Sequence, residues 1–229
     1  MTSIIGIKTL DNSVVLASDS YGQNNDNEKV PINKLKYNKE GSLAIAMWGG
    51  FISDILEDHL NLILNTEVLD LYQDLSDGFF KPLMDLNLAM GISDNDEYNI
   101  SSQLNFLVAT QMKIEDDELI EEPGLYHIQQ MGQTDEVEYL IDGTGSLYGG
   151  SFEEKLEKKV YSEKKAVTLA LDYINHTTKK DLYSNGLDLL IVDTNGTRSY
   201  SDIIKKQEDN YWNNIKRKIK KSRRQELRL

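Results

Sequence analysis

The chain has 229 residues, of which 39% are hydrophobic and 28% charged, and it carries a formal net charge of −13. This balance predicts a folded protein with a buried core and excludes a disordered chain. The absence of cysteine excludes disulfides, a thiol nucleophile and a cysteine-bound metal.

The first fifty residues predict two hairpins. Residues 4–8 and 14–17 are short apolar runs joined by a turn-forming Leu-Asp-Asn-Ser sequence, so we expect two strands. Residues 23–29 are polar and predict a loop. A second hairpin is expected from residues 35–37 and 43–47, which turn near a glycine.

Helices are expected next, and then more strands. Residues 52–63 carry an apolar stripe at helical spacing, and a second helical region covers about 68–90, where a glycine and a proline would kink or split it. Residues 104–109 alternate as a strand. Two further strands are expected at 124–131 and 137–141, with 132–135 between them.

The last third predicts two helices, a hairpin and a terminal helix. Gly149-Gly150 precedes a short helix, and a longer one ends near Lys180. Residues 187–192 and 198–200 flank Asn195-Gly196, which is typical of a hairpin. The order of elements predicts an α+β fold with sheets between helical layers, in one domain spanning residues 1–229.

We expect residues 201–229 to form a basic helical extension of that domain. Eight basic residues crowd its last turns: Lys216, Arg217, Lys218, Lys220, Lys221, Arg223, Arg224 and Arg228. Such a tail could bind a polyanion, or it could be a solvated or docked helix. The acidic body favours the second interpretation, so we expect no nucleic-acid partner.

Thr2 is the most informative candidate for chemistry. Removal of Met1 would give an N-terminal threonine, which carries a hydroxyl nucleophile together with its own base, the α-amine. With a pKa of roughly 7.7–8, part of that amine is unprotonated at neutral pH and can accept the hydroxyl proton.

Five short motifs occur in order along the chain, and the first of them begins with Thr2. They are Thr2-Ser3-Ile4-Ile5-Gly6-Ile7, Val14-Val15-Leu16-Ala17-Ser18-Asp19, Asn33-Lys34-Leu35, Ile141-Asp142-Gly143-Thr144-Gly145-Ser146, and Asp181-Leu182-Tyr183-Ser184-Asn185-Gly186 with the strand after it. In these motifs the chain resembles proteasome β subunits and related threonine peptidases, which are N-terminal nucleophile hydrolases.

The resemblance implies a four-layer αββα sandwich and a role for each matching residue. Thr2 would be the nucleophile, and Lys34 a buried cation that lowers its hydroxyl pKa and is oriented by Asp19. Hydrogen bonds around the Thr2 amine would come from Ser146, Asp181 and Ser184. The substrate would be a peptide or unfolded protein, with no cofactor and no metal.

The oxyanion hole and the substrate pocket are expected at the end of the strand over residues 43–47. Gly49 is the natural amide donor to an oxyanion, and Met47 is the other candidate. Ile45 and Met47 near the base of the pocket would favour an apolar side chain beside the cut bond.

The resemblance also implies an assembly and a location. We expect a homo-oligomeric ring that encloses the active sites and, by analogy, an ATP-dependent unfoldase as a possible partner. No signal peptide is visible and no apolar stretch reaches the roughly 18 residues of a membrane span, so a cytoplasmic protein without a membrane partner is expected.

Several alternatives stay open at this stage. The chain could be a catalytically silent ring subunit of the same fold, or an amidase or transpeptidase acting on another amide. The glycines of Gly143-Thr144-Gly145 could be turn glycines only, and Asp19 or Lys34 could be surface charges. A dinucleotide fingerprint is disfavoured because Tyr148 replaces its third glycine. His59, His127 and His176 show no metal-ligand spacing.

Overall fold

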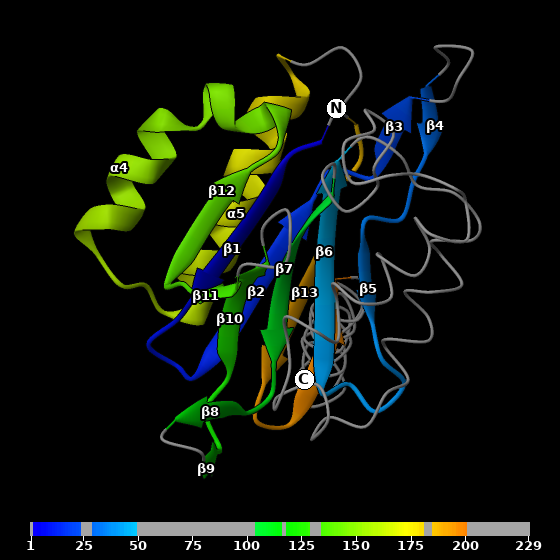
Figure 1. Cartoon of the computed structure of the whole chain (residues 1–229). Coiled ribbons are helices and arrows are strands. Elements are labelled where there is room, and N and C mark those ends of the chain that lie inside the picture. Colours follow the sequence, from blue (N-terminus) through cyan, green and yellow to red (C-terminus); the bar gives the residue numbers. More distant parts are fainter. Residues whose placement is uncertain are drawn as a thin grey trace, which may run out of the picture.

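Two five-stranded antiparallel sheets stack face to face in the computed structural model (Figure 1). The structure describes residues 2–23, 29–49, 104–115, 118–128, 134–180 and 185–200. In spatial order the first sheet contains β12 (Tyr139–Asp142), β1 (Ile4–Lys8), β2 (Ser13–Ser18), β13 (Asp188–Asp193) and β14 (Gly196–Ser199). The second contains β11 (Thr134–Glu136), β10 (Gly124–Ile128), β7 (Leu104–Thr110), β6 (Leu43–Gly49) and β5 (Leu35–Tyr37).

Side chains along the strands of the first sheet alternate between its two faces, and each face contributes to a separate hydrophobic core. In β2, Val14 and Leu16 point into the space between the sheets, whereas Val15 and Ala17 point to the opposite face. All four side chains are fully buried, so this strand is apolar without interruption. Complete burial of one such aliphatic side chain stabilises the fold by about 1.5–3 kcal/mol.

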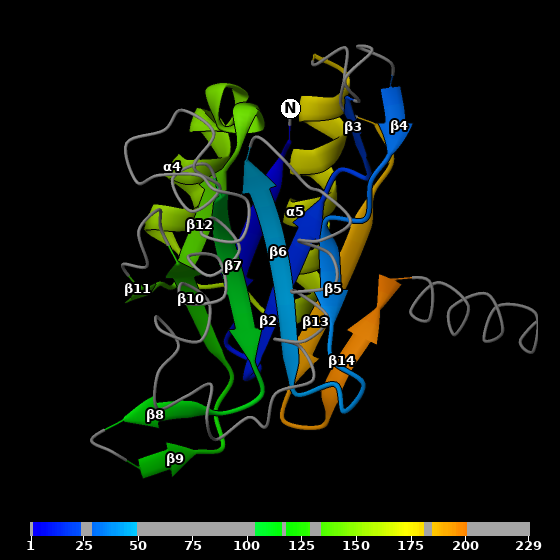
Figure 2. The ribbon, with the colours of Figure 1, turned by 45° about the vertical axis from the view of Figure 1, so that its right-hand side comes forward.

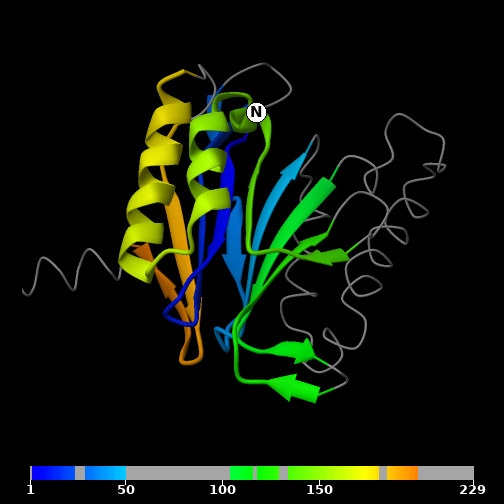
Figure 3. The same cartoon turned by 90° about the vertical axis from the view of Figure 1, so that its left-hand side faces the viewer.

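Two helices cover the outer face of the first sheet (Figure 3). They are α4 (Gly150–Lys158) and α5 (Glu163–Thr178), and α5 packs on β1 and β2 through a core that includes Ala170, Tyr173 and Ile174. The described residues therefore form a helical layer and two sheets. The helices expected over 52–63 and 68–90, which would supply a fourth layer, lie outside the described residues, as does the expected helix after residue 200.

Most strands expected from the sequence are confirmed. The residues 4–8 and 14–17 form β1 and β2, and the second hairpin is β5–β6, whose turn contains Gly41 at φ 74°. The short and long helices before the last hairpin are α4 and α5, and that hairpin is β13–β14.

Three expectations need correction. The loop over 23–29 includes strand residues, because Gln23 and Lys29 pair at the end of the hairpin formed by β3 (Tyr21–Gln23) and β4 (Lys29–Pro31). Residues 132–135 were expected to separate two strands, but Thr134 and Asp135 belong to β11. The hairpin of β8 (Lys113–Glu115) and β9 (Glu118–Ile120) lies in a segment for which no element was expected. Finally, the run 137–141 does not form one strand.

That run changes sheets in its middle. The amide of Val137 still donates to the Leu125 carbonyl of the second sheet, at 2.9 Å, whereas the Glu138 carbonyl accepts from the Lys8 amide of the first sheet, at 2.8 Å. After this crossing β12 runs antiparallel to β1 and places Asp142 opposite Ile4. The crossing thereby brings the 3₁₀ helix η3 (Thr144–Tyr148) beside the beginning of the chain.

Several segments meet at one end of the sandwich. The N-terminus, the last residues of β6 and the β3–β4 hairpin lie at this end, which is the upper one in the views, and β8 and β9 lie at the other (Figures 1 and 2). Three of the described residues with a predicted chemical role, Thr2, Asp19 and Lys34, lie at the upper end.

Candidate functional site

The Asp19 carboxylate connects the start of the chain to Lys34. Its Oδ1 accepts the Ser3 amide at 2.7 Å, and its Oδ2 accepts the Lys34 ammonium at 2.8 Å. The Ser3 carbonyl in turn accepts the Asp19 amide at 3.1 Å. The Asp19 carboxylate therefore brings Lys34 close to the residue that follows Thr2.

Both members of this ion pair are removed from water. Asp19 is 0% exposed and Lys34 is 2% exposed. Lys34 Nζ also donates to the Tyr21 carbonyl, so the cation has a second oxygen partner from the segment that follows Asp19. A buried ion pair persists only with such additional hydrogen bonds, because desolvation of both charges is costly. The surface-charge alternative does not apply to these two residues.

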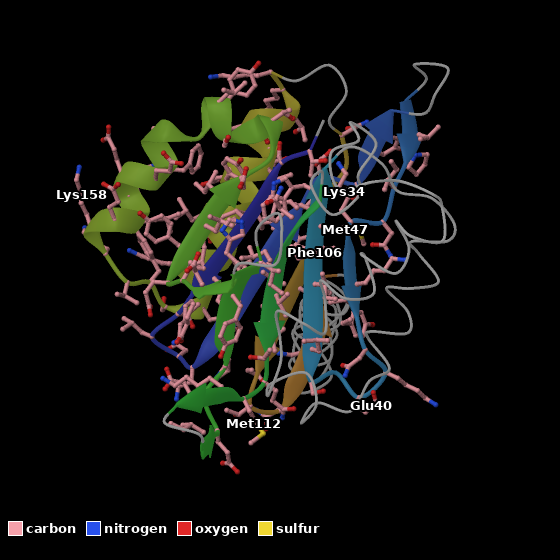
Figure 4. All side chains as sticks on the ribbon, in the orientation of Figure 1. Lys34, Glu40, Met47, Phe106, Met112 and Lys158 are labelled. Atoms are coloured by element: carbon pink, nitrogen blue, oxygen red, sulfur yellow. The ribbon has the colours of Figure 1, made fainter. Side chains whose placement is uncertain are left out.

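The Lys34 backbone leads from this ion pair into the second sheet. Its carbonyl accepts the Met47 amide at 3.1 Å, which extends the β5–β6 ladder by one pair beyond Leu35 and Ala46. Figure 4 labels Lys34 and Met47 near the upper end of the sandwich. The ammonium of Lys34 thus joins the second sheet to the Asp19 carboxylate, which follows a strand of the first.

Thr2 is held by the turn that follows β12. Its nitrogen donates to Thr144 Oγ1 at 2.9 Å, and the Thr144 hydroxyl donates back to the Thr2 carbonyl at 3.2 Å. The Gly145 amide also donates to the Thr2 carbonyl, at 3.1 Å. Thr2 is 9% exposed, so the turn covers its backbone closely.

The two glycines of this turn are required by the close approach of Thr2 and Ser3. Gly143 has φ 80°, and a Cβ atom there would lie 2.3 Å from the Thr2 carbonyl oxygen. A Cβ atom on Gly145 would lie 2.1 Å from Ser3 Oγ. No side chain fits in either place, so the two glycines have a structural reason beyond the turn itself.

Thr144 is the hydroxyl residue that sequence reasoning missed. Ser146 was expected to contact the Thr2 amine, and that role stays a prediction. The Thr2 nitrogen donates to Thr144, two residues earlier in the same motif. The Ser146 amide donates to the Gly143 carbonyl at 3.0 Å, within the turn. The available signal was the position of Thr144 between two glycines, where a side chain can closely approach another backbone.

Two predicted site residues, Asp181 and Ser184, lie outside the described residues. The chain after them is anchored beside the ion pair, because the Asn185 carbonyl accepts the amide of Ser20, the neighbour of Asp19, at 2.8 Å. Gly186 has φ 69°, and a Cβ atom there would lie 3.1 Å from Ser20 Oγ. The roles of Asp181 and Ser184 stay predictions.

Ile45 and Met47 lie on the outer face of the second sheet. Their neighbours Ala44, Ala46 and Trp48 belong to the core between the sheets, and strand alternation directs Ile45 and Met47 away from it. Both are 1% exposed. Their contribution to a substrate pocket stays a prediction.

The β6 ladder favours Gly49 over Met47 as an oxyanion donor. The Met47 amide is already bound to the Lys34 carbonyl. By alternation, the Gly49 amide faces the same edge of β6, opposite Ile32. The Ile32 amide instead donates to the Ser20 carbonyl at 2.9 Å, so the segment before β5 no longer pairs with β6 at this position. Gly49 as donor stays a prediction.

His127 places a half-buried imidazole at the same end of the core. Its ring stacks on Trp48 with centroids 5.7 Å apart, and its Nε2 is buried with no partner among the described residues. Burial lowers the pKa of His127 below its ordinary value of 6.5, although the negative charges of Asp142 and Asp135 act in the opposite direction.

This histidine predicts a pH dependence of stability. Because its folded-state pKa is below the unfolded value, its contribution is fully present above about pH 6.5 and is lost as pH falls through the folded pKa. We expect the free energy of unfolding, measured by chemical denaturation, to fall between about pH 7.5 and pH 5.5. His127→Phe, which keeps a ring against Trp48 but cannot titrate, should flatten this dependence. Equal slopes for the two proteins would contradict the assignment.

The described residues contain no group of three or more His, Asp or Glu side chains arranged to hold a metal ion. Among their helices, none combines the length and apolar character needed to cross a membrane.

Comparison with known proteins relates the chain to proteasome β subunits. It is 35% identical over 81 residues to proteasome subunit beta 1 of Cenarchaeum symbiosum (strain A). The aligned segment covers 35% of this chain and 42% of that protein, which is less than half of each. No family model matches the chain. The similarity agrees with the resemblance in the motifs at the level of a distant relationship.

Proposed function

We propose that this chain is a threonine peptidase in which Thr2, as the first residue of the mature protein, attacks peptide amides. The observation that carries the proposal is the Asp19 carboxylate, which binds the Ser3 amide next to Thr2 and the buried Lys34 ammonium. A buried cation beside a terminal hydroxyl and amine is an arrangement suited to activating that hydroxyl.

The chemistry proceeds in two halves. The Thr2 α-amine accepts the proton of Oγ1, and Oγ1 attacks the amide carbonyl carbon to give a tetrahedral oxyanion. The C–N bond then breaks, the leaving amine takes the proton, and an ester joins Thr2 to the acyl group. Water adds to this ester with its proton passing to the α-amine, and the acid product leaves as Oγ1 regains a proton.

Four groups on the described residues would assist these chemical steps. The Thr144 hydroxyl accepts a hydrogen bond from the Thr2 nitrogen, so it would orient the free amine toward Oγ1. Lys34 supplies positive charge for the developing alkoxide, and Asp19 keeps that cation in place. The Gly49 amide is the proposed donor to the oxyanion.

The proposal extends to fold and assembly. We propose that the two sheets and the α4–α5 layer are part of a four-layer αββα sandwich, and that copies of the chain form a ring around their active sites. Peptides or unfolded proteins are the proposed substrates, with an ATP-dependent unfoldase as a possible partner by analogy.

Intact-mass spectrometry with a threonine-directed inhibitor tests the proposal. We expect the expressed protein to lack Met1 and to gain the mass of one inhibitor after treatment with a peptide epoxyketone or a β-lactone. Fragmentation should place the adduct on Thr2, because the reaction needs the hydroxyl and, for the epoxyketone, the free amine.

A protein that retains Met1, or a free Thr2 that stays unlabelled, would overturn the proposal in favour of a catalytically silent ring subunit. Labelling of Thr2 combined with transfer of the acyl group to an added amine, rather than to water, would instead indicate a transpeptidase.

A further inference from the structure

Two buried hydroxyl groups behind Thr2 have no partner in the described structure. They are Ser3 Oγ and the Tyr173 hydroxyl, and both residues are 0% exposed. Buried polar groups in proteins are nearly always hydrogen-bonded, so each of these groups calls for an explanation. Neither of them takes part in the chemistry described above.

Both hydroxyl groups lie close to Gly145. A Cβ atom built on Gly145 would lie 2.1 Å from Ser3 Oγ and 3.0 Å from the Tyr173 hydroxyl oxygen. Two oxygens that converge on one point, without bonding directly, can be bridged by a single water molecule, which needs two to four polar partners. The two distances place the hydroxyl oxygens within about 5 Å of each other, a separation that one water molecule can span.

Tyr173 reaches this point from the helical layer. Its ring lies in the core between α5 and the first sheet, edge-on to Phe152 with centroids 5.5 Å apart. Burial raises the pKa of the Tyr173 phenol, and nearby carboxylates, Asp142 first among them, raise it further. The phenol therefore stays protonated at neutral pH and can donate a hydrogen bond.

Ser3 connects this point to the candidate active site. Its amide and carbonyl both bind Asp19, and it is joined directly to Thr2. The Gly145 amide donates to the Thr2 carbonyl. Any group that fixes the Ser3 side chain relative to Gly145 thus fixes the backbone of Thr2 from both sides.

We propose that Ser3 and Tyr173 form a positioning pair, joined through one bound water molecule beside Gly145, which ties α5 to the Thr2 backbone and holds the Thr2 amine and hydroxyl in register with Lys34. The pair acts through Thr2 and touches no substrate. Its effect on catalysis rests on the proposed function, whereas its hydrogen bonding does not.

Tyr173→Phe and Ser3→Ala test the pair. Each variant should slow β-lactone labelling of Thr2 by roughly three- to tenfold, the effect of one buried hydrogen bond. Each variant should also shift the pH dependence of the labelling rate. Movement of the Thr2 backbone would change the surroundings of the Thr2 amine and therefore its pKa. Turnover of a peptide should fall in kcat with little change in KM, and the double variant should be no slower than either single variant.

Tyr161→Phe is the matched control. The Tyr161 hydroxyl donates to the Lys155 carbonyl at 3.0 Å at an exposed position, and its removal should change neither the labelling rate nor the pH profile. Additive losses in the double variant, or wild-type profiles in both single variants, would overturn the pair. If Tyr173→Phe does not fold, Ser3→Ala carries the kinetic test.

A crystal structure of the wild-type protein at a resolution that shows ordered water provides a measurement independent of activity. We expect one water within hydrogen-bond distance of both Ser3 Oγ and the Tyr173 hydroxyl. Density without this water, and with the hydroxyls apart, would overturn the proposal even in an active enzyme. An unlabelled wild-type Thr2 together with the bridging water would overturn the peptidase proposal alone.

Discussion

Thr2→Ala should reduce peptide turnover by roughly 10⁴-fold or more while the protein stays folded. The change removes the hydroxyl that would form the ester and leaves the α-amine without a proton to accept. It leaves the backbone contacts of Thr2 with Thr144 and Gly145 in place, because these use its nitrogen and carbonyl. Turnover of a fluorogenic peptide, followed together with thermal unfolding, measures both effects.

Thr9→Ala is the matched control for this variant. The Thr9 hydroxyl is bonded to Ser13 Oγ at 2.9 Å at the other end of β1, and its loss should cost about 1 kcal/mol of stability without changing turnover. Thr2→Ser should retain part of the activity, because it keeps a hydroxyl beside the amine. Wild-type turnover in Thr2→Ala would contradict the role of Thr2.

Local sequence patterns were sufficient to predict the longer strands and the two α-helices of the described residues, but not the three-residue strands β3, β4, β8, β9 and β11. The strand β2 is buried on both faces, so its residues Val14, Val15, Leu16 and Ala17 are all apolar. Such a run predicts a buried strand without knowledge of the neighbouring strands. The change of sheet at Val137 and Glu138 could not be predicted from the sequence. It depends on the amide of Val137 and the carbonyl of Glu138, which form hydrogen bonds with different sheets. These are backbone bonds, and they do not require a particular side chain at either position.

In the candidate site, the pairing of charged residues could be predicted from the sequence, whereas the contacts of the hydroxyl groups of Thr144 and Tyr173 could not. A lysine that is buried needs a buried acid, so Lys34 and Asp19 could be paired from their motifs. The choice between Thr144 and Ser146 depends on the backbone of Gly143, whose φ of 80° sets the direction in which the following residues leave β12. The Tyr173 hydroxyl was also missed, because helical spacing identifies Tyr173 as a core residue and says nothing about its terminal oxygen.

Lys34→Met should be the most damaging change at the ion pair, in both stability and activity. Removal of the ammonium leaves the Asp19 carboxylate buried without its positive partner, although the hydrogen bond from the Ser3 amide remains. Breaking a buried ion pair in this way costs about 3–5 kcal/mol, which corresponds to a fall in Tm of roughly 10 °C. Turnover should fall by roughly 10²–10³-fold with the loss of the cation. Chemical denaturation and peptide turnover measure the two effects.

Lys158→Met is the control for the loss of a lysine charge. Lys158 pairs with Glu154 at 3.8 Å on α4, and its side chain is 69% exposed, so the change should cost less than about 0.5 kcal/mol. Figure 4 labels Lys158 on α4, away from Lys34. A loss of stability in Lys34→Met as small as that in Lys158→Met would contradict the buried ion pair.

The double variant Asp19→Asn/Lys34→Met separates the structural role of the pair from its chemical role. Asparagine keeps an oxygen for the Ser3 amide and removes the charge that Lys34 neutralised, so most of the lost stability should return. Activity should not return, because the double variant has no cation beside Thr2 to stabilise negative charge on Oγ1. If activity recovered together with stability, Lys34 would serve only to neutralise Asp19, and the cation would have no part in activating Thr2.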